Sequence, residues 1–331
     1  MPKTILITGA NRGIGLGIIK KIIFCKKFNY KIILCSRTIE KGQIALNDIS
    51  TQLAAYKYDY SNSDIIYNNL DSNNVKIDIN SDNFKFNDST NEANNNKTLL
   101  DNLLSNVYIE QLDITNKNSI ENLIKILKQK YSGKIDCLVN NAGVHSFNYD
   151  IESFNYIIGT NFNSTVLFTE KLLENNIIPL GGKIIIISSG TGKLSNINNK
   201  LILKKFLEPN IDINRLFEIS NLVKISIQDG TYDEDKESFP NKLYNLSKIL
   251  INKYTYILGH RDDILKKNIQ IYACTPGWVR TDMGGKTATK SIEEGVVTPC
   301  MLIEKDYEVD KQFQGKFFED EKLCEIDDVD L

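Results

Sequence analysis

The sequence has few of the residues on which several common kinds of site depend. It contains only 2 histidines and 6 cysteines, and no two cysteines form a Cys-x-x-Cys pair. Structural zinc sites and disulfide frameworks need such residues at regular spacings. The sequence therefore predicts no metal site and no histidine-based triad. Scattered cysteines favour reduced thiols in a cytoplasmic protein.

An excess of charge and long apolar runs are also missing. Lys and Arg number 40 against 42 Asp and Glu, so the formal net charge is −2. A nearly neutral chain argues against a nucleic-acid or acidic-membrane partner held by charge. No apolar run approaches the roughly 20 residues of a transmembrane helix. The first residues, Met-Pro-Lys, lead directly into a strand pattern and leave no room for a signal peptide.

Short apolar runs that alternate with helical patterns indicate the fold class. Helices are expected at 119–131 and 291–303, among others. This alternation predicts an α/β fold, a Rossmann-like doubly wound parallel sheet in three αβα layers, as a single domain over residues 1–331. The expected strands are residues 3–8, 31–36, 107–112, 135–139, 183–187, 269–274 and 315–318.

Three segments depart from this pattern. Residues 56–105 are rich in Asn, Asp and Ser, and we expect a low-complexity surface insertion there because such a segment buries little apolar surface. Residues 190–240 leave from a strand's carboxyl end and contain two helical patterns, so they should form a helical cover over the ligand site. Residues 319–331 are expected to be a frayed acidic tail.

The run Thr8-Gly9-x-x-x-Gly13-x-Gly15 stands between the first predicted strand and a helical pattern. In that context glycines let the backbone turn tightly and approach a pyrophosphate, while the helix N-terminus favours negative charge. A glycine cluster at such a place can also be a plain tight turn.

Arg37 follows the second predicted strand, about 20 residues after the glycine loop. An acidic residue there would hydrogen-bond the ribose of NAD, whereas an arginine suits the 2′-phosphate of NADP. Arg37 therefore favours NADP, and Arg12 within the loop adds a second cation. Glu40 lies close by, and Arg37 could instead simply begin a solvated helix.

Small and polar residues stand at the carboxyl ends of later predicted strands, where a doubly wound sheet binds ligands. They could meet the adenine or support the cofactor floor, although Asn and Gly are also ordinary turn residues. Trp278 in a Pro-Gly loop could line a substrate pocket or pack as a surface aromatic. His145 is interpreted as a loop residue rather than a catalyst. The residues at these strand ends are Asp113, Ile114, Asn140, Asn141, Ala142, Gly143 and Ser189.

Tyr244 and Lys248 lie four residues apart in a helical pattern, so their side chains should share one helix face. An ammonium beside a phenol lowers the phenol's pKa from about 10 and makes it usable in acid–base catalysis. The same spacing is common on solvated helices. Asn161 is a poor helix former inside an apolar helical pattern, so it is either tolerated at the surface or marks a functional kink.

Taken in order, these motifs resemble the short-chain dehydrogenase/reductase superfamily, and most closely its NADPH-dependent, monomeric carbonyl reductase branch. The wide separation of Ser189 from Tyr244 and the run Pro276-Gly-Trp-Val-Arg-Thr-Asp-Met283 are similar to the carbonyl reductase pattern. Thr275 departs from some members, which carry a second cysteine there, so no thiol-linked behaviour is implied. The motifs that carry the resemblance are Thr8-Gly9-x-x-x-Gly13-x-Gly15, Asn140-Asn-Ala-Gly143, Ser189, Tyr244-x-x-x-Lys248 and Pro276-Gly277.

The resemblance implies NADPH-dependent reduction of aldehydes, ketones or quinones to alcohols by hydride transfer. It implies that Tyr244 donates the proton, Ser189 polarises the carbonyl, Lys248 lowers the Tyr244 pKa and holds the nicotinamide ribose, and Asn161 positions a water. Substrate contacts would come from Ser189, Trp278 and Met283. By the same resemblance the cofactor-binding residues are Thr8, Gly9, Asn11, Arg12, Gly13, Ile14, Gly15, Arg37, Asp113, Ile114, Asn140, Asn141, Ala142, Gly143, Tyr244, Lys248, Pro276, Gly277, Val279 and Thr281.

Two alternatives stay open at this point. The chain could be a dedicated NADP-dependent reductase for one steroid-, terpene- or alkaloid-like ketone, or a non-enzymatic NADP-binding sensor, since fold does not fix function. Retention of both Tyr244 and Lys248 argues against the sensor. Tetramers of the family pair the helices that carry Asn161 and Tyr244. The covering segment should obstruct that packing, so we expect a monomer.

Overall fold

The computed structural model describes residues 2–25, 30–54, 104–231, 242–305 and 312–326, together with the backbone of three short strands, β3 (Lys57–Asp59), β4 (Asp64–Ile66) and β5 (Lys76–Ile77). β3, β4 and β5 form a small sheet of their own. The predicted insertion at 56–105 otherwise lies outside the described residues.

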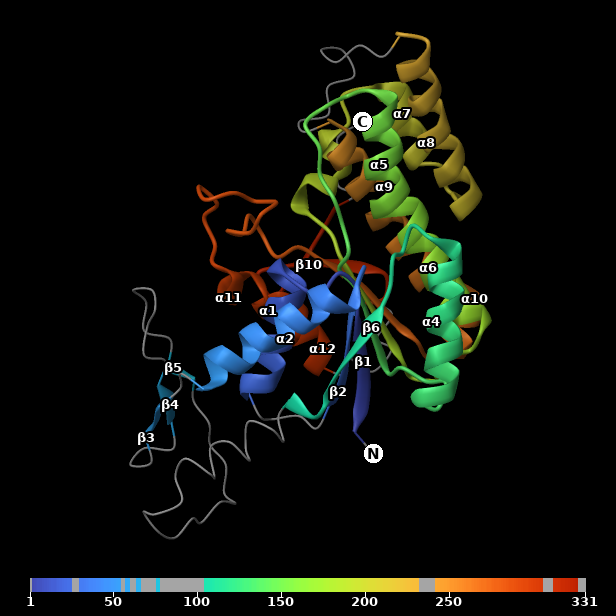
Figure 1. The fold of residues 1–331 in the computed structure, drawn as a ribbon. Helices are drawn as coiled ribbons and strands as arrows, with labels where there is room; N and C mark the ends of the chain where they lie inside the picture. Colours follow the sequence, from blue (N-terminus) through green and yellow to red (C-terminus); the bar gives the residue numbers. More distant parts are fainter. Residues whose placement is uncertain are drawn as a thin grey trace, which may run out of the picture.

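The main sheet has the order β11-β10-β9-β8-β7-β1-β2-β6, and every pairing except that of β11 is parallel (Figure 1). The predicted doubly wound α/β fold is therefore confirmed. The central strands are short, mostly buried runs, as expected where both sheet faces are covered, whereas the edge strand β11 is largely exposed. The strands are β1 (Lys3–Ile7), β2 (Tyr30–Ser36), β6 (Val107–Gln111), β7 (Cys137–Asn140), β8 (Lys183–Ile187), β9 (Gln270–Cys274), β10 (Lys316–Glu319) and β11 (Lys322–Cys324).

Helices cover both faces of this sheet, and each face has its own apolar core. On one face lie α1 (Gly13–Cys25), α2 (Ile39–Ala54), α11 (Ile292–Gly295) and α12 (Val297–Glu304). On the other lie α4 (Lys117–Lys130), α5 (Ile151–Ile158), α6 (Thr165–Glu174), α9 (Lys242–Gly259) and α10 (Asp262–Lys266), with α7 (Lys200–Phe206) and α8 (Ile213–Gln228) outside them.

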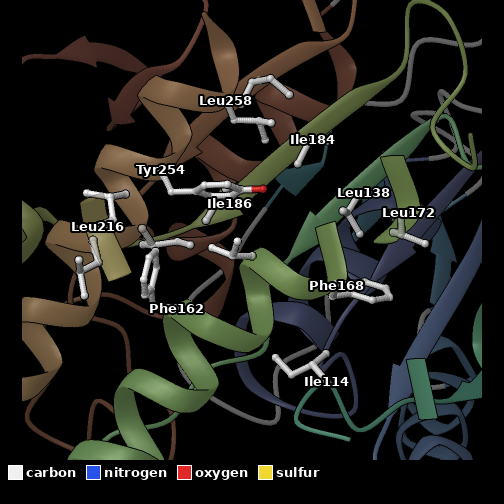
Figure 2. Close-up of a cluster of buried hydrophobic side chains, with 14 of the residues drawn as sticks. Ile114, Leu138, Phe162, Phe168, Leu172, Ile184, Ile186, Leu216, Tyr254 and Leu258 are labelled. Atoms are coloured by element: carbon white, nitrogen blue, oxygen red, sulfur yellow. The ribbon is translucent and has the colours of Figure 1, made fainter. Parts of the chain in front are cut away.

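The second of these cores fixes α9 against the centre of the sheet. Figure 2 shows Tyr254 and Leu258 of α9 close to Ile184 and Ile186 of β8, and all four side chains are almost completely buried. Burying an apolar side chain of this size stabilises a fold by about 1.5–3 kcal/mol. The helix that carries Tyr244 and Lys248 is therefore anchored in this core, and it packs directly against β9.

The segment 190–240 contains the two expected helices, α7 and α8, within its described residues 190–231. α8 buries Leu216, Ile219 and Val223 and packs against α5 and α9, and the ring of Phe217 lies 5.0 Å from that of Phe162. Figure 1 shows α7 and α8 beside α5 and α9. The segment thus covers the outer faces of those two helices.

Two expectations near the C-terminus were wrong. The helix predicted at 291–303 is divided at Val296, because Pro299 has no N–H to donate to the carbonyl four residues earlier and its ring would clash there. The tail from residue 319 is not frayed throughout, since β11 pairs with β10 through a turn at Asp320 and Glu321. Both turn residues have positive φ, at 48° and 62°, and neither is the Gly or Asn that signals such a hairpin.

Candidate active site

The loops after β7, β8 and β9 lie side by side, because these strands are neighbours in the sheet. The chain runs outward from β1 to β2 and β6 and then returns to β7 on the other side of β1. In open α/β sheets, ligands bind outside the carboxyl ends of the strands at such a reversal. The predicted site residues that follow β1, β7, β8 and β9 therefore meet at one edge.

The turn between β1 and α1 has a conformation that glycine adopts readily. Gly9 has φ +61° and Gly13 has φ +55°, both in the left-handed region. A Cβ on Gly15 would lie 2.5 Å from Nδ2 of Asn141, so a side chain has no room there. Arg12, at the start of α1, is exposed, whereas Asn11 and Ile14 are half-buried. The amino end of α1 therefore presents backbone N–H groups beside a turn in which glycines leave space for a ligand.

The loop after β7 holds this glycine turn in place. Oγ1 of Thr8 accepts hydrogen bonds from the backbone N–H groups of Asn141 and Ala142, each at 2.9 Å. The Asn141 amide donates to the carbonyl oxygens of Thr8 at 2.8 Å and Gly9 at 3.2 Å. Asn140 is buried and donates to Thr169 at 2.9 Å. The Asn-Asn-Ala-Gly motif thus connects the loop after β7 to the glycine turn after β1 by hydrogen bonds.

A dinucleotide fits this arrangement, because the glycines leave a cradle that a Cβ would fill and a helix N-terminus favours a pyrophosphate. Thr281 approaches the same turn, since its methyl group would lie 3.5 Å from a Cβ on Gly13. Arg37 is exposed at the end of β2. Arg12 is exposed and pairs with Asp282 at 2.8 Å. These two guanidinium groups suit an additional phosphate on the ribose.

Asp113 and Ile114, expected near the adenine, have local roles as well. The Asp113 carboxylate accepts hydrogen bonds from the Thr115 backbone N–H at 2.9 Å and its hydroxyl at 2.7 Å. Ile114 is buried in the core shown in Figure 2. Both residues follow β6, as expected for residues that contact the adenine, and this contact stays a prediction.

The loop after β9 is held in shape by its own backbone. Gly277 has φ +78°, and a Cβ there would lie 2.9 Å from the Lys290 side chain. Trp278 donates from its indole to the Gly284 carbonyl at 2.9 Å, yet 53% of it is exposed. Met283 is also exposed, whereas Val279 is buried and Pro276 half-buried. Trp278 and Met283 are therefore available to a substrate at this edge.

Asn161 lies in a one-turn π-helix, Gly159–Ser164, between α5 and α6. Such turns interrupt α-helices most often at functional sites. The Asn161 side chain is buried; it accepts from the Val144 N–H at 2.8 Å and donates to the Val144 carbonyl at 2.9 Å and to Ser247 Oγ at 3.0 Å. Ser247 in turn donates to the Tyr244 carbonyl at 2.6 Å. The expected irregularity is confirmed, and Asn161 ties the β7 loop to α9.

Tyr244 and Lys248 share one face of α9, as their spacing predicts. Nζ of Lys248 lies 5.4 Å from the centroid of the Tyr244 ring. It also donates to the Ile187 carbonyl at the end of β8 at 3.1 Å. Ser189, two residues later, interacts with the Tyr244 hydroxyl and accepts hydrogen bonds from Thr191 N and Oγ1 at 3.2 and 3.0 Å. The three polar groups converge at one point.

The electrostatics differ from the expectation that Lys248 lowers the phenol's pKa. Burial raises the pKa of Tyr244 to about 12, and the Ser189 side chain is the group that opposes this rise. Burial also lowers the pKa of Lys248 to about 8, with the Cys274 thiol acting weakly the other way. Desolvation is the largest cause of both pKa shifts, because it disfavours the charged form of each group.

His145 was not expected at the site but contacts Tyr244. Its ring centroid lies 5.1 Å from the Tyr244 ring and 4.6 Å from the Phe147 ring. Burial lowers the pKa of His145, so the imidazole is neutral near pH 7. Its place two residues after the Asn-Asn-Ala-Gly motif was the signal that sequence reasoning undervalued.

Comparison with known proteins agrees with this geometry. A sequence model of the short chain dehydrogenase family matches residues 82–201. Carbonyl reductase (NADPH) 1 of Mus musculus is 28% identical over 325 residues, which cover 96% of this chain and 96% of that protein. The chain is similar to proteins of the short-chain dehydrogenase family.

Other members extend the likeness along nearly the whole chain. Carbonyl reductase (NADPH) 3 of Homo sapiens is 26% identical over 312 residues, covering 90% of this chain and 89% of that protein. The structure of salutaridine reductase from Papaver somniferum has a TM-score of 0.69 at 20% identity, over 96% of this chain and 99% of that one. At that identity the structural likeness shows a shared fold alone.

Two further findings concern only the described part of the chain. None of its helices is long and apolar enough to cross a membrane. No group of three or more His, Cys, Asp and Glu side chains there is placed to hold a metal ion.

Proposed function

We propose that this protein is an NADPH-dependent carbonyl reductase that converts aldehydes, ketones or quinones to alcohols. The observation that carries the proposal is the convergence of Tyr244, Lys248 and Ser189 at the carboxyl edge of the sheet, beside a glycine turn that fits a dinucleotide. The relatives named carbonyl reductase (NADPH), which align over nearly the full chain, support the same activity.

Tyr244 is the proton donor in this proposal. Because its pKa is about 12, the phenol stays protonated throughout the neutral range and can transfer its proton to a carbonyl oxygen that gains charge. Ser189 holds that oxygen by donating a hydrogen bond and so polarises the carbonyl. When bound, the nicotinamide supplies the hydride to the carbonyl carbon.

Lys248 and Asn161 act through position. The Lys248 ammonium lies over the Tyr244 ring and stabilises the phenolate left after proton transfer, which would otherwise be costly in a buried site. We propose that it also binds the nicotinamide ribose. Asn161 bonds Val144 and Ser247 and so fixes the β7 loop relative to α9. Its proposed role in placing a water near Lys248 would be in addition to this contact.

The preference for NADPH rests on Arg37 and Arg12. Arg37 is exposed just after β2, where a ribose 2′-phosphate is recognised in such folds, and Arg12 immediately precedes α1. The Arg12–Asp282 pair joins the glycine turn to the loop after β9. An exposed pair of this kind contributes little by itself, so Arg12 can exchange Asp282 for a phosphate.

The test is NADPH oxidation measured across a panel of quinones, aldehydes and ketones, with NADH in parallel. The proposal predicts turnover of several carbonyl classes and a lower KM for NADPH than for NADH. Activity confined to one ketone would instead indicate a dedicated reductase. NADPH binding without turnover of any carbonyl would indicate a binding protein and contradict the proposal.

We also propose that the protein is a cytoplasmic monomer. The packing of α8 over α5 and α9 supports the monomer, because it covers the helices through which family tetramers are expected to pair. Among the described residues, the free thiols of Cys35, Cys274 and Cys324 support a reducing compartment. Light scattering after size exclusion tests the first point, and a tetramer would refute it.

A further inference from the structure

Three aromatic rings from two different elements form a continuous row at the proposed active site. Phe147 packs edge-on against His145 at a centroid distance of 4.6 Å and an interplanar angle of 71°. His145 packs against Tyr244 at 5.1 Å and 57°. Tyr244 and His145 are half-buried, whereas 79% of Phe147 is exposed. The row therefore runs from the proposed proton donor out to solvent.

The loop that carries His145 and Phe147 is fixed on both sides. Val144, immediately before His145, makes two hydrogen bonds to the Asn161 side chain. Ser146 lies between the two aromatic residues. Its hydroxyl oxygen is 3.3 Å from the hydroxyl of Ser153 in α5, and it accepts a hydrogen bond from the Asn148 backbone N–H at 3.3 Å. The rings are thus presented by an anchored loop rather than by a free one.

Phe147 offers an exposed apolar ring beside the proposed proton donor. A substrate that binds beside the catalytic group can cover such a ring, and burying the apolar surface of the ring stabilises the complex. Flat rings prefer offset or edge-on packing against aromatic side chains, at centroid distances of about 4.5–7 Å. His145 is uncharged near pH 7, so it adds no second cation beside Lys248 and acts as an aromatic surface.

We propose that Phe147, His145 and Tyr244 form an aromatic wall that makes the enzyme favour carbonyl groups attached to a flat ring over aliphatic ones. Phe147 and His145 are the specificity-determining residues, and Tyr244 keeps its role as proton donor. The inference rests on the proposed reductase function. It assigns to the loop after β7 a task separate from its bracing of the glycine turn.

The test compares two aldehydes with the same carbon skeleton, benzaldehyde and cyclohexanecarbaldehyde, of which only the first is flat. The kcat/KM of each is measured at saturating NADPH for the wild type and for the variants His145→Ala, His145→Phe and Phe147→Ala. Each Ala variant is expected to lower the benzaldehyde-to-cyclohexanecarbaldehyde ratio by roughly 2- to 10-fold, the range of one aromatic contact. His145→Phe keeps an aromatic ring and should retain the ratio.

The chain offers a matched control in its only other histidine. His260 packs its ring 4.3 Å from that of Tyr256, which is also in α9 but 12 residues beyond Tyr244. His260→Ala removes the same side chain from the same kind of pair, about 18 Å further along the helix at 1.5 Å per residue. Its aldehyde ratio should equal that of the wild type.

The outcomes separate the two proposals. An unchanged ratio in His145→Ala and Phe147→Ala, or an equal loss for both aldehydes, overturns the aromatic wall while the reductase function stands. A wild type that binds NADPH but reduces neither aldehyde nor any other carbonyl overturns the proposed function and the wall with it. Phe147 is exposed, so its variant should fold even if His145→Ala does not.

Discussion

Lys248 carries a charge at a position that is only 7% exposed, and the cost of that charge can be measured as stability. Its pKa falls from 10.5 to about 8 through burial. One pKa step corresponds to about 1.4 kcal/mol, so keeping the charged form inside the fold costs about 3 kcal/mol at neutral pH. Lys248→Met removes this cost but loses the hydrogen bond to the Ile187 carbonyl, a loss of about 1–2 kcal/mol. We expect the variant to be more stable than the wild type by about 1–2 kcal/mol at pH 7.

The pH dependence of wild-type stability tests the same penalty for burying the Lys248 charge independently. Because the folded pKa lies below the unfolded value, the unfolded chain binds more protons between pH 8 and 10.5, and wild-type stability should rise across that window. Below pH 8 the full penalty is present. The advantage of Lys248→Met should therefore shrink as pH rises above 8.

Urea denaturation followed by circular dichroism at pH 7 and pH 9.5 measures both effects. Lys125→Met is the control, because Lys125 is exposed on α4 and because Lys and Met are both good helix formers. The free energy of unfolding of this variant should stay within about 0.5 kcal/mol of the wild-type value. A Lys248→Met protein that is less stable than wild type at pH 7, with m unchanged, would refute the reasoning. The stabilised variant should also have lost carbonyl reduction.

Three other predictions concern the cofactor and the proton donor. A Cβ at Gly15 would lie 2.8 Å from the Cα of Ala10, so Gly15→Ala should lower the free energy of unfolding by about 1–3 kcal/mol, measured by urea or thermal denaturation. Gly159→Ala is the control, because a Cβ there would have no atom within 4 Å, and it should not destabilise the protein. Arg37→Ala should raise the KM of NADPH by about 10- to 100-fold and leave that of NADH nearly unchanged, the loss expected for one charged hydrogen-bonded contact; equal effects on both would contradict the assignment. In the reductive direction kcat/KM should fall above about pH 8, as Lys248 loses its proton while Tyr244 keeps its own to about pH 12; a profile flat to pH 10 would count against it.

Much of this architecture was predictable because its signals are local. Apolar runs followed by glycine or polar residues marked the central strands, and β8 begins and ends at the expected residues. The i, i+4 spacing of Tyr244 and Lys248 correctly placed both side chains on one helix face. The misfit of Asn161 in an apolar helix correctly indicated an irregular turn. In each case the residue type itself restricts the backbone.

What sequence reasoning missed depends on contacts between distant residues. The pKa of Tyr244 could not be obtained from its neighbour in the helix, because it depends on burial in the folded protein and on the Ser189 side chain. The position of His145 after the Asn-Asn-Ala-Gly motif does not reveal its contact with Tyr244, because that contact depends on Asn161, which joins the β7 loop to α9. β11 was missed since its turn uses Asp320 and Glu321 in place of glycine.

The central claim is that the Tyr244 hydroxyl supplies the proton for reduction at this site. Tyr244→Phe keeps the ring that packs on His145 and lies beneath Lys248, and removes only the hydroxyl. NADPH affinity by fluorescence titration and carbonyl turnover should be measured on the same preparation. We predict unchanged NADPH binding with turnover reduced by about 10²–10⁴-fold, the usual contribution of general acid catalysis. Tyr244→Phe protein that binds NADPH and still reduces carbonyls at the wild-type rate would contradict the claim.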